Sequence, residues 1–100
     1  MDKSLIVTPA AQKDIEQVFQ WYEAQEEDLG FRFLRAVDGA FARIEKRGES
    51  FALRVREYRR IPLEVFPYLI YFKIKGDQIV VNFVVHTARN PSFLSRRLRH

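Results

Sequence analysis

Residues 54–91, RVREYRRIPLEVFPYLIYFKIKGDQIVVNFVVHTARNP, decide the fold of this 100-residue chain. Apolar and polar residues alternate over 68–75 and again over 78–86, which is the period-two pattern of β-strands. The dipeptide Gly76-Asp77 separates the two runs and is typical of a two-residue hairpin turn. We expect the arginine-rich segment 54–62 to form the strand before this hairpin, giving a three-stranded antiparallel sheet.

The alternation also predicts which side chains share a face of the sheet. In the first strand of the hairpin the apolar face consists of Tyr68, Ile70, Phe72 and Ile74. In the second strand it consists of Ile79, Val81, Phe83 and Val85. We expect this face to pack on helices. The opposite face, which would carry Tyr71, Asn82 and His86, should be only half covered.

The N-terminal half predicts a short strand followed by two helices. Residues 3–7 are rich in branched apolar side chains, and Thr8-Pro9 is a helix start signal. Apolar residues then recur every three or four positions to about Gln25, and again from Phe33 to Ile44. The short turn between the runs predicts an antiparallel helix hairpin.

These elements predict an α+β fold with the order β-α-α-β-β-β. The helix hairpin would pack on one face of a small, mainly antiparallel sheet, and residues 92–100 could add a short basic C-terminal helix. A chain of this length can bury one core, so we expect a single domain over residues 1–100.

The composition excludes several classes of protein. Without cysteine there are no disulfides and no thiolate zinc site, and a reducing cytoplasm is the expected location. No signal-like segment and no run of about 20 apolar residues occurs, so we expect no membrane partner. Phosphate-binding, metal-binding and nucleophile motifs are missing, and one of the two histidines is the last residue. We therefore expect no metal and no cofactor.

The charge is divided unevenly between the two halves of the chain. Residues 1–52 hold seven Lys and Arg against ten Asp and Glu, a balance of −3, whereas residues 53–100 hold ten against three, a balance of +7. A cationic half favours an anionic partner, either nucleic acid or an acidic protein surface. A well-solvated surface is the alternative.

Arginines and one histidine are the candidate site residues. Arg54, Arg56, Arg59 and Arg60 form the strongest cationic group. Guanidinium groups bind phosphate and carboxylate bidentately, although charges also protect an edge strand from aggregation. His86 is the candidate for proton transfer near neutral pH, and Arg89 could stabilise a developing phosphate charge. Alternatively, His86 is structural and hydrogen-bonds the next turn.

The order of these features resembles the RelE/ParE superfamily of bacterial toxins, which includes plasmid-stabilisation proteins. The resemblance runs from Val7 to Pro91 and is carried by FPYLIY at 66–71 and HTARNP at 86–91. Asp14-Ile15 and Arg32-Phe33 also match. It implies a toxin of a type II toxin–antitoxin module, with an acidic antitoxin as partner in a hetero-oligomer.

The superfamily has two mechanisms. RelE-like members cleave mRNA on the ribosome, whereas ParE-like members bind DNA gyrase. Tyr68 stands where RelE nucleases often have arginine, and no tyrosine follows Pro91, so the resemblance favours the ParE-like branch. The expected target-binding residues are Arg56, Arg59, Arg60, Tyr71, His86, Arg89, Arg96 and Arg97.

Two alternatives stay open. The first is a RelE-like, ribosome-dependent mRNA endoribonuclease, with Arg60, His86 and Arg89 as the catalytic candidates. The second is a non-toxic family member that binds an antitoxin or regulates its operon.

Overall fold

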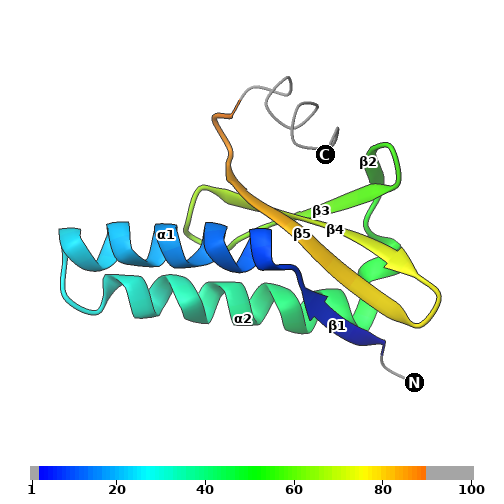
Figure 1. Ribbon diagram of the computed structural model, residues 1–100, viewed down its shortest axis with the longest axis horizontal. Helices are drawn as coiled ribbons and strands as arrows, with labels where there is room; N and C mark the ends of the chain where they lie inside the picture. The colour runs from blue at the N-terminus through cyan, green and yellow to red at the C-terminus, as the bar shows by residue number, and fades with distance from the viewer. Residues whose placement is uncertain (1–2, 90–100) are drawn as a thin grey trace.

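Two antiparallel helices pack on one face of a five-stranded sheet (Figure 1). The computed structural model describes residues 3–89. Along the chain the elements are β1 (Ser4–Val7), α1 (Pro9–Gln25), α2 (Leu29–Arg47), the 3-10 turn η1 (Gly48–Ser50), β2 (Leu53–Val55), β3 (Tyr58–Pro62), β4 (Tyr68–Lys75) and β5 (Gln78–His86). The predicted α+β class is confirmed. The expected helix at 92–100 lies outside the described residues.

The strand order is β1-β5-β4-β3-β2. The predicted hairpin of β4 and β5 is confirmed, and Gly76 in its turn has φ +60. The N-terminal strand β1 pairs in parallel with β5, so that Leu5 lies opposite Ile79 and Val7 opposite Val81. The first and last strands of the chain are therefore neighbours, and α1 starts beside the middle of β5.

The expectation of one strand over 54–62 is wrong, because this segment folds into the β2–β3 hairpin. The chain reverses at Arg56, whose φ is +51. No glycine, proline or asparagine marks this turn, so the sequence carries no ordinary turn signal there. The sheet gains one strand, and Arg56 lies exposed at the turn.

A bulge in β5 changes the predicted faces of its last residues. Tyr71 pairs with Phe83 and Phe72 with Val81, so Asn82 is an extra residue between them. Before the bulge, Ile79 and Val81 face the helices as predicted.

After the bulge the alternation is shifted by one residue. Val84 joins the core beneath the helices, whereas Phe83 and Val85 pack with Tyr58 and Tyr71 on the other face. The prediction that Phe83 and Val85 share the face of Ile79 is therefore wrong, because each extra residue in a strand exchanges its two faces.

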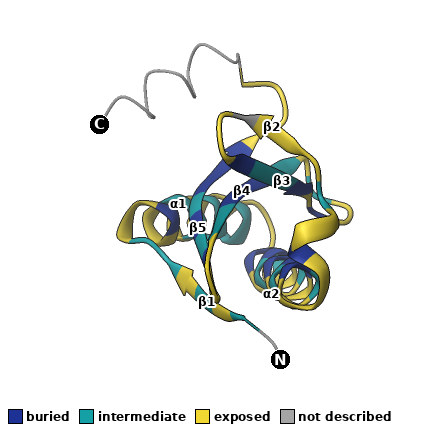
Figure 2. Cartoon of the chain, turned by 90° about the vertical axis from the view of Figure 1, so that its right-hand side faces the viewer, coloured by how far each residue is buried: buried dark blue, intermediate teal, exposed yellow. Residues whose placement is uncertain are grey.

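The main core lies between α2 and the central strands, as the buried segments of Figure 2 show. Its fully buried large side chains are Phe33, Ile44, Ile61, Ile70, Phe72, Ile79 and Val81. The predicted helix start is confirmed, because the Thr8 hydroxyl accepts the N–H of Ala11 at 3.1 Å. Within residues 3–89 no helix is long and apolar enough to cross a membrane.

Candidate functional site

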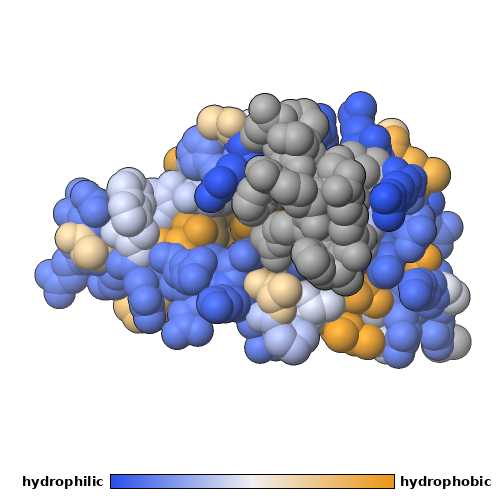
Figure 3. Space-filling model, turned by 45° about the horizontal axis from the view of Figure 1, so that its top comes forward, coloured by the Kyte–Doolittle hydropathy of each residue, from blue (hydrophilic) through white to orange (hydrophobic). Residues whose placement is uncertain are grey.

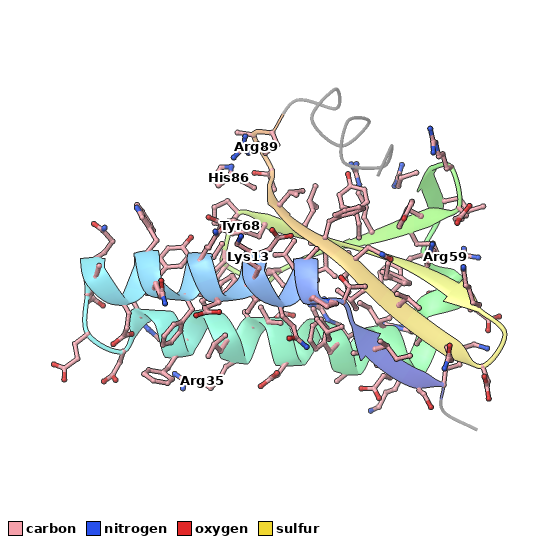
Figure 4. The ribbon with its side chains drawn as sticks, in the orientation of Figure 1. Lys13, Arg35, Arg59, Tyr68, His86 and Arg89 are labelled. Carbon is pink, nitrogen blue, oxygen red and sulfur yellow. The ribbon has the colours of Figure 1, made fainter. Side chains whose placement is uncertain are left out.

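A cavity of about 220 Å³ opens between α1 and the ends of β4 and β5. It is lined by Asp14, Gln17, Val18, Tyr68, Val84, Val85, His86 and Arg89. Tyr68, His86 and Arg89 lie one above another where β5 ends, close to α1 (Figure 4). Most of these side chains are polar, although Val18 and Val84 contribute apolar surface.

Asp14 holds α1 against the wall of this cavity. Its Oδ2 accepts the N–H of Val84 at 3.0 Å. The pairing of β1 with β5 ends at Val81, so a carboxylate on α1 takes the place of a further strand. A backbone hydrogen bond to a charged acceptor contributes about 1.5–3 kcal/mol to stability. The sequence carried no signal for this contact, because Asp14 and Val84 are 70 residues apart.

Tyr68 connects the cavity to the aromatic core. Its ring meets that of His86 edge-on, with centroids 5.2 Å apart, and lies 5.7 Å from the ring of Phe33. Burial raises the pKa of the Tyr68 hydroxyl; Tyr22 adds to this, and the positive charge of Arg89 opposes it. The hydroxyl is therefore neutral at physiological pH and can donate a hydrogen bond, but cannot act as a base.

His86 organises the turn that follows β5. Its Nδ1 accepts the N–H of Ala88 at 3.0 Å, and its carbonyl accepts the N–H of Arg89 at 3.0 Å. The N–H of Thr87 donates to the carbonyl of Pro67 at 2.9 Å. These bonds support a structural role for His86, since they fix the backbone that carries Arg89 to the cavity. His86 shares this cavity with α1 rather than lying on the open face, which corrects the sequence-based expectation.

Arg60 and Tyr71 lie on the opposite face of the sheet. Arg60 Nη1 donates to the Tyr71 hydroxyl at 3.1 Å, and Tyr71 is only 3% exposed. We expected the nuclease candidates Arg60, His86 and Arg89 to lie together, but only His86 and Arg89 line the same cavity. The reason is the strand alternation: Arg60 pairs with Tyr71, whose side chain packs with Phe83, away from the helices.

The side chain of Arg59 points away from that of Arg60 and hydrogen-bonds the loop that follows α2. It pairs with the core residue Phe72, and its Nη1 donates to the carbonyl of Phe51 at 2.7 Å and that of Glu49 at 3.5 Å. Figure 4 places it at the other end of the sheet from His86 and Arg89. Arg56 is exposed at the β2–β3 turn, and Arg96 and Arg97 lie outside the described residues.

Replacing Arg59 with methionine should therefore destabilise the protein and leave its activity per folded molecule unchanged. Loss of the hydrogen bonds to the loop carbonyls should lower the free energy of unfolding by about 1.5–3 kcal/mol in urea denaturation. Arg54→Met, at an exposed position of β2, is the matched control and should change it by less than about 0.5 kcal/mol. If the Arg59→Met variant keeps wild-type stability but loses target binding, Arg59 is one of the target-binding residues.

The polar groups that line the cavity are a guanidinium, a carboxylate, a phenolic hydroxyl, an imidazole and the Gln17 amide. Gln17 and Asp14 were not among the expected site residues, since single polar residues on a helix give no signal by themselves. Within residues 3–89, no three His, Cys, Asp or Glu side chains cluster closely enough to hold a metal ion. The arrangement suits recognition of a polar group.

Comparison with known proteins matches the chain to a family model and to solved structures. The family model described as the ParE toxin of type II toxin–antitoxin system, parDE, matches residues 5–91. Among solved structures, a chain described as "Chromosomal ParDE TA system from P. aeruginosa" shares the fold with a TM-score of 0.64. It is 20% identical, over 84% of this chain and 95% of that chain. A search of the curated proteins found no match.

Proposed function

Because the chain belongs to the ParE toxin family of type II toxin–antitoxin systems, we propose that it inhibits DNA gyrase by binding and that a cognate acidic antitoxin neutralises it. Target binding would centre on the end of β5, where His86 and Arg89 are exposed beside the cavity. The toxin would have no chemistry of its own.

The observation that carries the binding mechanism is the separation of the candidate nuclease residues. Cleavage of RNA by its 2′-hydroxyl needs proton transfer and charge stabilisation around one phosphate. Arg60 lies on the face of the sheet away from the helices, whereas His86 lies at the cavity beside α1. Two side chains on opposite faces cannot act on the same phosphate, which supports capture of a protein target over cleavage.

A second surface supports the antitoxin as partner. An apolar groove of about 400 Å³ runs between α1 and α2, and Ile15, Phe19, Leu34 and Phe41 are among its lining residues. Such a groove suits an amphipathic segment that folds as it binds. The positive charge of residues 53–100 would attract the acidic part of the same partner. The result would be a toxin–antitoxin hetero-oligomer.

Purified protein should inhibit DNA supercoiling by gyrase, and addition of the antitoxin should restore it. Arg89→Ala should raise the concentration needed for half-inhibition by about ten-fold or more, because arginine is a frequent hot-spot residue in interfaces. Arg54→Ala, at the other end of the sheet, should retain wild-type potency. Circular dichroism would confirm that both variants are folded.

Full supercoiling activity of gyrase in the presence of the wild-type protein would contradict this proposal. New mRNA ends soon after induction, absent in Arg89→Ala, would instead identify the ribosome-dependent nuclease. Harmless expression without the antitoxin would identify a non-toxic family member.

A further inference from the structure

The β3–β4 loop, residues 63–67, holds an apolar side chain in an unfavourable conformation. Val65 has φ +72 and is 96% exposed. The N–H of Phe66 donates to the carbonyl of Glu64 at 2.8 Å, so Val65 is the centre of a three-residue γ-turn with positive φ. This conformation is strained for any side chain branched at Cβ, and glycine would adopt it freely. Residues strained in this way cluster at binding and switch sites, which makes Val65 a candidate for function.

The base of this loop is firmly held. The N–H of Leu63 donates to the carbonyl of Tyr68 at 2.9 Å, and the N–H of Tyr68 to that of Phe66 at 2.8 Å. The Phe66 ring also packs edge-on against Tyr22 and Phe33, at centroid distances of 5.0 and 5.6 Å. The tip is thus presented by a rigid support, so a partner that binds it would order little additional chain.

Trp21 is a second exposed apolar group at the same aromatic cluster. It is 57% exposed, and its ring lies 5.1 Å from that of Tyr22, which contacts Phe66 under the tip. Much of the surface in Figure 3 is hydrophilic, and its apolar patches are separate. An exposed valine and an exposed tryptophan lie around one aromatic cluster, and such groups mark interaction sites when they gather.

A cationic side chain, that of Arg89, lies on the turn that is joined to this loop. The Pro67 carbonyl accepts the N–H of Thr87, which joins the loop to the turn that carries His86 and Arg89. The acidic residue of the tip, Glu64, is 3.9 Å from Arg43 and so is partly compensated. Tryptophan, tyrosine and arginine around an apolar anchor are the composition of interface hot spots.

We propose that Val65 and Trp21 are the apolar anchors with which the toxin binds its protein target. Val65 would enter an apolar pocket of the target, and carboxylates at the rim of that pocket would face His86 and Arg89. The inference rests on the proposed function in one respect, namely that the toxin acts by binding a protein.

Val65→Gly tests the anchor, because it removes the side chain and also relieves the strain. Its midpoint of thermal unfolding should rise by about 2–5 °C, whereas its half-inhibitory concentration for supercoiling should rise about ten-fold. Val65→Ile keeps the strain and should keep the unfolding midpoint of the wild type, whereas Arg54→Ala, at an exposed position of β2, is the control that should keep wild-type inhibition. Trp21→Ala should weaken inhibition without loss of fold.

Full inhibition by Val65→Gly, or a lower unfolding midpoint, would overturn the proposal. Antitoxin binding, measured by co-purification, should be unchanged in Val65→Gly; its loss with inhibition intact would assign the loop to the antitoxin and also overturn it. If wild-type protein arrests growth but leaves gyrase active, the proposed target is wrong. The growth-arrest potency of the same variants then still tests the anchor.

Discussion

Replacing Phe33 with alanine should lower the free energy of unfolding by about 3–5 kcal/mol, the usual cost of deleting a buried aromatic ring. The side chain is fully buried, and its ring lies within 5.7 Å of those of Tyr22, Phe66 and Tyr68. It therefore joins the helix hairpin to the β3–β4 loop and to the tyrosine of the cavity. Since a whole domain is stable by only about 5–15 kcal/mol, much of the stability depends on this ring.

Phe31→Ala is the matched control on the same helix. Phe31 is 49% exposed, and its ring contacts that of Phe19 at 5.0 Å. Loss of this exposed aromatic pair should cost about 0.5–1.5 kcal/mol. Urea denaturation of the two variants measures the difference. Equal losses at Phe31 and Phe33 would contradict the placement of the core between α2 and the sheet.

Gly30→Ala should destabilise the protein by about 1–3 kcal/mol, which is the usual cost of overpacking. A Cβ at this position would lie 2.7 Å from the backbone oxygen of Phe19 and 2.8 Å from its Cδ1. The helices would have to separate at their connection. The hydrogen bond that Gly30 N–H donates to Glu23 Oε1, 2.9 Å long, would be disturbed as well. The gain in helix propensity, about 1 kcal/mol, does not offset these costs.

The same substitution at Gly39 should have the opposite sign. A Cβ there meets no atom within 4 Å, so Gly39→Ala adds helix propensity without a clash. We expect it to raise the free energy of unfolding by about 0.5–1 kcal/mol. Together the two substitutions separate the cost of close packing from the gain in helix propensity within one helix. Stabilisation by both alanines would show that α1 and α2 are not in close contact at Gly30.

The sequence alone determined the elements that depend on neighbouring residues. Thr8 and Pro9 start α1. The Thr8 side chain accepts a hydrogen bond from a backbone N–H of the first turn, and Pro9 has no backbone N–H that would need a partner. Gly76 allows the positive φ that the β4–β5 turn requires. The order of these elements, with the motifs at 66–71 and 86–91, was enough to indicate the toxin family that the match over residues 5–91 establishes.

Only the tertiary structure decided how the cationic residues are distributed. The bulge at Asn82 shifts the alternation of β5 by one residue, and it arises from pairing with β4 rather than from any local signal. The adjacent arginines of β3 point to opposite faces of the sheet. Arg59 hydrogen-bonds a loop carbonyl beside α2, whereas Arg60 hydrogen-bonds Tyr71 on the other face. The cavity at His86 likewise depends on Asp14, 70 residues from its partner Val84. Local signals fix where strands and helices begin, whereas the face that a side chain occupies depends on register, which only long-range pairing sets.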